Sequence, residues 1–170
     1  MSSQPDSNYR NILQSLKEKI RQARLKATLA INQELLNVYW EIGNTILQQQ
    51  QQQGWGTKVI DRFITDLKTA FPNMKGLSPR NVKYMRAFAE AYPTFQIVQR
   101  SVAQLQSNEN QYTTIVRRSV AQLPWGHNCT LLDKLDTIEE RLFYAQKAIT
   151  YGWTRELPSI EEIETWLYEH

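Results

Sequence analysis

The stretch SPRNVKYMRAFAEAY, residues 78–92, contains the signals that begin and end a helix. Ser78 is a favourable N-cap, and Pro79 stands at the first helical position, where its missing N–H is not needed. Pro93 follows the stretch and stops the helix. At about 100° per residue, one face is apolar and is predicted to be buried: Val82, Met85, Phe88, Ala89 and Tyr92.

The opposite side of the same helix is basic. No acidic residue precedes Glu90 on it, and small Ala87 would allow close approach to a groove. Arginine and lysine contact phosphates or guanine edges, and asparagine can form two hydrogen bonds with adenine. These residue types fit nucleic acid, although a solvated surface helix would show the same pattern. The candidate DNA contacts are Arg80, Asn81, Lys83, Tyr84 and Arg86.

A helix and a turn precede this stretch. We expect the helix from Thr57, as its cap, to about Ala70, and the turn over residues 71–77. A basic helix that follows another helix and a turn is the helix-turn-helix arrangement of DNA-binding proteins. The turn is longer than the usual length of about three or four residues, which favours a winged-helix variant.

Further upstream, periodicity predicts two amphipathic helices, from about Asn8 to Thr28 and from about Ala30 to Gln48. The second is apolar around most of its circumference, so it should be the most buried helix of the chain. Gly43 within it permits a close helix crossing or is simply tolerated. The glutamine run that begins at Gln48 is typical of a frayed helix end or a polar loop.

Downstream, the sequence contains a tandem duplication. IVQRSVAQL at residues 97–105 and IVRRSVAQL at residues 115–123 agree at eight of nine positions, with a shift of 18 residues. The two copies predict either a hairpin or a looped-out insertion that leaves the core intact.

Three helical signals follow the duplication. The first covers about residues 130–135. The second begins at Thr137, which forms a capping box with Glu140, and reaches about Tyr151. The last is acidic and begins at Ser159. Glycine and proline are scarce, at six each, which disfavours a turn-rich β fold. We therefore predict an all-α domain with a helix-turn-helix or winged-helix-like element and room for one small β-hairpin.

The net charge of +3 is unevenly distributed. Residues 75–118 contain seven Lys and Arg against two acids, whereas residues 119–170 contain four against nine. This asymmetry suggests a surface for a polyanion, or two solvated faces. No apolar run approaches the roughly 20 residues that cross a bilayer, and the N-terminus does not resemble a signal peptide. We therefore expect a cytoplasmic protein without a membrane partner.

No combination of residues indicates catalysis. Asp61, Asp66 and Lys68 fit a short nuclease-like D-x-K fragment, but they fall within a helical pattern, where chance explains them better. Cys129 is the single cysteine, and it and His127 lack identifiable partners, so neither a disulfide nor a metal site is predicted. The sequence has no glycine-rich phosphate loop. We expect no catalytic residue, no metal and no cofactor.

Four blocks of sequence carry a family resemblance. In order along the chain they read LLNVYWEIGNTIL, GWGTKVIDRFITDLKTAFPNMKGLSPRNVKYMRAFAEAYP, VAQLPWGHN and RLFYAQKAITYGWTR. Together they resemble the N-terminal domain of the YhcG-like family of prokaryotic proteins, over roughly residues 8–155. The resemblance implies a helix-turn-helix-type, DNA-binding domain, which in that family precedes a PD-(D/E)xK nuclease-like domain. It also implies that residues 76–85 are the counterpart of the recognition helix.

We therefore predict that residues 1–157 form a helical DNA-binding domain with a duplicated insertion at about 97–123, and that residues 158–170 form an acidic C-terminal helix. Because the sequence stops at His170, the nuclease-like domain is expected to be absent. The predicted function is non-enzymatic binding of double-stranded DNA, alone or beside a separately encoded nuclease-like protein. The alternative is a protein-interaction or homodimerisation module that uses the acidic last helix and the C-terminal aromatics: Trp153, Trp166 and Tyr168.

Overall fold

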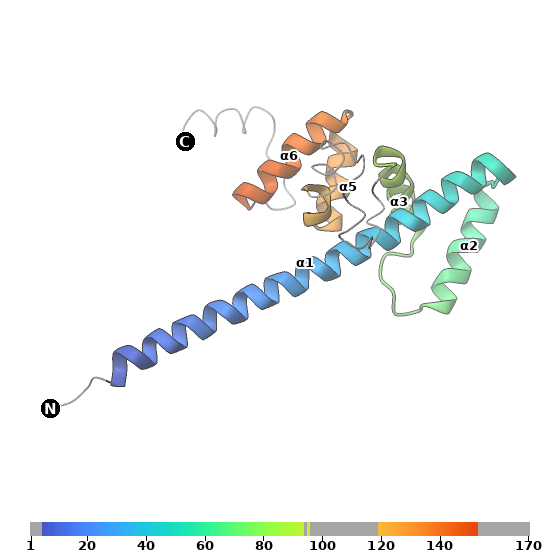
Figure 1. Cartoon of the computed structure of the whole chain (residues 1–170). Helices are drawn as coiled ribbons and strands as arrows, with labels where there is room; N and C mark the ends of the chain where they lie inside the picture. The colour runs from blue at the N-terminus through green and yellow to red at the C-terminus, as the bar shows by residue number, and fades with distance from the viewer. Residues whose placement is uncertain (1–4, 94, 96–118, 153–170) are drawn as a thin grey trace, which may run out of the picture.

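The computed structural model describes residues 5–93, 95 and 119–152, and within these ranges every regular element is a helix (Figure 1). The helices are α1 (Pro5–Gln53), α2 (Thr57–Ala70), α3 (Pro79–Ala91), α5 (Trp125–Lys134) and α6 (Ile138–Tyr151). The predicted all-α class is confirmed. None of these described helices is both long and apolar enough to cross a bilayer.

α1 is a single helix of 49 residues, so the predicted division into two helices near Thr28 is wrong. The apolar positions move to another face of the helix near this point, and this change imitates a boundary in the sequence. No glycine or proline lies between Pro5 and Gly43 to stop the helix. The Thr28 hydroxyl donates a hydrogen bond (2.9 Å) to Arg24 O one turn earlier. α1 also includes the whole glutamine run.

α3 packs across the C-terminal half of α1 (Figure 1). A Cβ atom on residue 43 would collide with the backbone carbonyl of Met85 and crowd the Arg86 N–H. The two helix backbones therefore meet where Gly43 leaves space for them. This confirms that the glycine permits a close crossing, and the packing offsets the cost of about 1 kcal/mol that glycine imposes on a helix interior relative to alanine.

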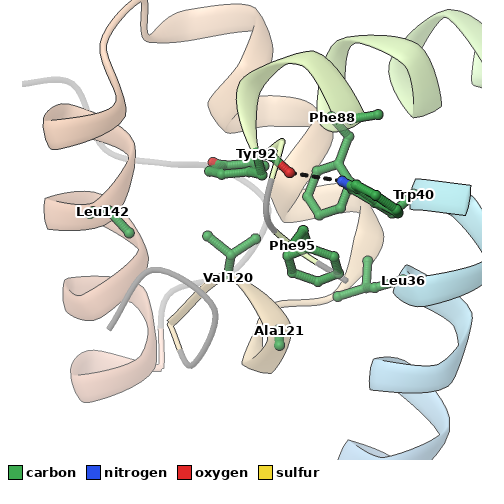
Figure 2. Close-up of a cluster of buried hydrophobic side chains, with 9 residues drawn as sticks. Leu36, Trp40, Phe88, Tyr92, Phe95, Val120, Ala121 and Leu142 are labelled. Carbon is green, nitrogen blue, oxygen red and sulfur yellow. Dashed lines mark hydrogen bonds between the residues drawn. The ribbon is translucent and has the colours of Figure 1, made fainter. Parts of the chain in front are cut away.

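The main core lies where α1, α3 and α6 meet (Figure 2). Every residue of the predicted apolar face of α3 is exposed by 2% or less. Trp40 of α1 donates a hydrogen bond from Nε1 to Tyr92 O (2.8 Å), which satisfies the buried indole. Phe88 stacks edge-to-face on Tyr92 and on Phe95, with ring centroids 5.0 and 4.8 Å apart. Each such side chain contributes about 1.5–3 kcal/mol by leaving water.

The end of the second repeat copy, residues 119–123, contributes Val120 and Ala121 to this core. Its apolar side chains are buried, and Asn32 of α1 donates hydrogen bonds from Nδ2 to Ala121 O (3.2 Å) and Leu123 O (2.8 Å). The first four of these residues are helical. Residues 96–118, which include the first copy, lie outside the described ranges, and there the insertion and the β-hairpin stay predictions.

Two helix starts follow the predicted capping. The Ser78 hydroxyl accepts a hydrogen bond from the Asn81 N–H (3.2 Å) at the start of α3. At the start of α6, Thr137 and Glu140 form the predicted capping box in both directions. The two helices therefore begin where the sequence places them.

Two other starts differ from the prediction. α5 begins at Trp125, not near residue 130, because the preceding proline serves as its N-cap. Gly56, not Thr57, is the N-cap of α2, and its backbone carbonyl accepts the first helical hydrogen bonds without a side-chain cap. The predicted last helix at Ser159 falls outside the described residues.

Candidate nucleic-acid interface

The turn that leads into α3 is fixed by α1. Gly76 has a φ of 95°, which glycine adopts without strain, and a Cβ atom there would meet the Tyr39 hydroxyl. That hydroxyl donates a hydrogen bond to Lys75 O (3.1 Å). Leu77, the next apolar residue, is buried. The start of α3 is therefore anchored to α1 and the core.

Asn81 joins three elements through its side-chain amide. Its Nδ2 donates a hydrogen bond to Gly76 O (2.7 Å), and its Oδ1 accepts one from Trp125 Nε1 (2.7 Å). The Trp125 ring in turn packs edge-to-face against Tyr39 (4.8 Å) and Phe88 (5.4 Å). Since both ends of the amide bond within the protein, Asn81 holds the turn, α3 and α5 together.

A groove of about 700 Å³ opens between α1, the start of α3 and α5. The first turns of α3 and α5 both line it. The N-terminal end of a helix has unpaired N–H groups and a partial positive charge, and both favour an anion. The side chains that give the groove its chemistry are Lys75, Arg80, Asn81, Tyr84, Trp125, Cys129 and Asp133.

The predicted phosphate contacts Arg80 and Lys83 are both exposed on α3. Lys75 adds a third exposed cation from the turn that precedes the helix. The basic surface therefore consists of Lys75, Arg80 and Lys83, and two of its three members come from the sequence prediction.

Tyr84 is tied to α5 by its hydroxyl. It donates a hydrogen bond to Asp133 Oδ2 (2.7 Å), and this acceptor raises the pKa of Tyr84, while a hydrogen bond from Arg80 acts in the opposite direction. Asp133 therefore places one negative charge near the cationic side chain of Arg80. The Tyr84 hydroxyl is engaged within the protein, and its half-buried ring forms part of the groove wall.

Arg86, the last predicted contact, lies where α3 meets α1. Its side chain is half-buried, and its Nε has no hydrogen-bond partner among the described residues. Its backbone N–H lies close to Gly43 at the helix crossing. Arg86 therefore presents less free surface to a ligand than the exposed cations of the first turns.

Cys129 is the cysteine that lines the groove. Burial raises the pKa of Cys129 to about 11, and the charge of Asp133 adds to the rise. A thiol with this pKa stays protonated at neutral pH and is a weak nucleophile. His127 is buried in the first turn of α5.

The nuclease-like fragment lies on α2, where Asp61, Asp66 and Lys68 are exposed. Asp66 pairs with Arg62 one turn earlier (3.8 Å). Within the described ranges, no group of three or more His, Cys, Asp or Glu side chains could hold a metal ion. Asp61 and Lys68 line a pocket between α2 and the start of α3, together with Ser78 and Pro79.

The sequence prediction missed the contribution of α5 to this site. Trp125 and Asp133 face α3 from the other side of the groove, and their part depends on how α5 packs against α3. Residues this far apart in sequence show no shared periodicity. One signal in the sequence could have linked α3 with α5. Residues 76–85 and residues 124–128 lie in separate blocks that carry the same family resemblance.

Comparison with known proteins confirms that resemblance. Residues 15–170 match the DUF1016 N-terminal domain, the family of YhcG-like N-terminal domains. No curated protein and no solved structure matches the chain. The match covers most of the sequence, and the chain belongs to this family.

Proposed function

We propose that this member of the DUF1016 N-terminal domain family is a non-enzymatic module that binds double-stranded DNA with the first turns of α3. The observation that supports it most is the group of exposed cations, Lys75, Arg80 and Lys83, around the capped start of that helix. The helix itself is held by the Asn81 network, so binding requires little ordering of the protein backbone.

In this proposal the cations and the helix end bind phosphates. Lys75 and Lys83 neutralise the DNA backbone, and the N-terminus of α3 adds its partial positive charge. Arg80 is the residue placed to reach a base edge or a phosphate with its planar guanidinium. Asn81 and Tyr84 become positioning residues, because both are engaged inside the protein. Arg86 remains a flanking contact.

α2 and α3 correspond in this proposal to the two helices of a helix-turn-helix element. Both bury apolar residues in one cluster with α1, in which Ile60 and Ile64 of α2 join Val82 and Met85 of α3. The long turn between them is compatible with this role because α1 supplies the common support. α1 therefore holds α3 in position to enter a groove of DNA, although α2 and α3 do not pack compactly against each other.

The test is fluorescence anisotropy with a duplex DNA probe at two salt concentrations. Removing both exposed cations in Arg80→Ala/Lys83→Ala should weaken binding at low salt about tenfold or more. It should also reduce the slope of log K against log salt by about 2, since each lost phosphate contact releases about one counterion fewer. Lys58→Ala/Lys134→Ala, which removes the same charge from exposed positions on α2 and α5, is the control.

A third variant makes the same test more specific. Asp133→Asn removes the negative charge beside Arg80 and Tyr84, so it should strengthen DNA binding about two- to fivefold. Absence of binding at low salt, or equal losses in the α3 variant and the control, would contradict the proposal. Because the proposed module is non-enzymatic, duplex DNA should stay uncut during incubation with the protein and Mg²⁺.

A further inference from the structure

The N-terminal half of α1 projects away from the rest of the described chain (Figure 1). Its apolar side chains remain in water: Ile12, Leu16 and Ile20 are exposed by 52%, 50% and 53%. Single exposed apolar residues are common on protein surfaces, but a continuous row of them marks an interaction site. This half of the helix therefore has a face that nothing in the described ranges covers.

Most of the exposed apolar residues of this half form one narrow stripe, while Leu25, exposed by 60%, lies outside it. At about 100° per residue the residues of the stripe fall within an arc of about 100°. Their main positions are separated alternately by four and three residues, which is the spacing of a coiled-coil seam. We name this set the α1 stripe: Tyr9, Ile12, Leu13, Leu16, Ile20, Ala23 and Ala27.

The stripe faces away from the core. By the same angular count, its centre lies about 170° around the helix from Leu36 and about 130° from Trp40, which the core buries. A segment that covered the stripe would therefore contact the side of α1 that the described body leaves free. This orientation favours a segment from another chain over one that remains packed on the body of its own.

Both edges of the stripe are basic. Lys17 and Arg24 border it on one side, and Lys19 and Lys26 on the other, whereas Glu18 points the opposite way and pairs with Arg21 (3.7 Å). Two α1 stripes packed together would bring these cations face to face in either orientation, which is unfavourable. The charges therefore call for an acidic amphipathic helix as the partner.

The chain contains one segment of this chemistry. Residues 159–170, SIEEIETWLYEH, contain four glutamates and no lysine or arginine. The sequence predicts a helix there, with Ile160, Ile163 and Leu167 on one side. A helix of twelve residues is about 18 Å long. The large residues of the α1 stripe, Tyr9 to Ile20, span nearly the same length.

We propose that the α1 stripe binds the acidic segment 159–170 of a second copy of this chain. In a symmetric pair each copy offers its stripe and its acidic segment to the other, so both contacts form at once. Apolar side chains of the two helices pack along the seam, and the glutamates meet the lysines and arginines at its edges. This proposal is independent of DNA binding by α3.

The test is the molar mass of the nuclease-treated full chain, measured by light scattering after size exclusion, without DNA. The wild type should have the mass of a dimer. Lys17→Glu/Lys19→Glu/Arg24→Glu and Glu161→Lys/Glu162→Lys/Glu164→Lys should each weaken the dimer about tenfold or more. The protein that combines both sets restores opposite charges across the seam and should dimerise again.

A control separates the stripe from the rest of the helix. Asn11→Glu/Gln14→Glu/Arg21→Glu places glutamates on the far side of α1 and should leave the dimer intact, with circular dichroism confirming helix content for every variant. A monomeric wild type, or a combined variant that stays monomeric, would overturn the proposal. Lys17→Glu/Lys19→Glu/Arg24→Glu could instead remain a dimer and lose binding to phosphatidylserine vesicles or duplex DNA. That result would show that the basic edges of the α1 stripe bind an anionic ligand and not the acidic segment.

Discussion

The two halves of α1 are parts of one continuous helix, yet they have opposite environments. In the C-terminal half, Leu36, Trp40 and Ile46 are exposed by 5% or less, whereas the stripe residues of the N-terminal half are about half exposed. Both halves show regular apolar spacing. The comparison teaches that periodicity identifies a face that needs a partner, but the partner itself depends on the rest of the fold.

The largest expected contrast comes from truncating one large apolar residue in each half. Trp40→Ala removes a buried ring and its hydrogen bond to Tyr92 O, so the free energy of unfolding should fall by about 3–5 kcal/mol. Leu16→Ala should change it by about 0.5 kcal/mol or less when the chain is monomeric. Urea unfolding at low protein concentration measures both. Similar losses in the two variants would show that the halves have the same environment.

A smaller effect is expected at the crossing with α3. Gly43→Ala forces a Cβ against the Met85 carbonyl, so α1 and α3 must separate, at a cost of about 2–3 kcal/mol despite the better helix propensity of alanine. Thr45→Ala, at an exposed position of the same helix, should be neutral or slightly stabilising. Thermal unfolding followed by circular dichroism compares them. A stable Gly43→Ala protein would refute the close crossing.

The smallest effect concerns alkaline pH. Burial raises the pKa of Tyr92 from 10.0 to about 12. The folded state therefore holds this proton more tightly than the unfolded state, so stability is lost as pH rises from 10 towards 12, by about 1 kcal/mol at pH 11. Tyr92→Phe should reduce this dependence. Urea midpoints at pH 8, 10 and 11 test it, and equal slopes in both proteins would contradict the burial of the hydroxyl.

The local signals in the sequence were sufficient for most of the helix ends. Ser78 with Pro79, and Thr137 with Glu140, identify their helix starts because capping depends only on neighbouring residues. The division of α1 at Thr28 was wrong because a change of apolar face resembles a helix boundary when the partners of each face are unknown. Sequence alone therefore located α3 and its buried face better than it described α1.

The candidate interface could be predicted only in part. Exposure of Arg80 and Lys83 follows from the angular position of each residue on α3. The engagement of Asn81 by Trp125, and of Tyr84 by Asp133, depends on contacts between segments that are distant in sequence. These contacts engage the Asn81 amide and the Tyr84 hydroxyl within the protein, which the sequence alone does not show.

The projecting half of α1 also determines how the protein moves through solution. Residues 5–31 of the helix extend over about 40 Å, while a compact chain of this length has a radius of gyration of about 15 Å. A monomer of this shape diffuses more slowly than a sphere of its mass and leaves a size-exclusion column early. Its elution volume alone would imitate that of a larger particle, so only an absolute mass separates the extended monomer from a dimer.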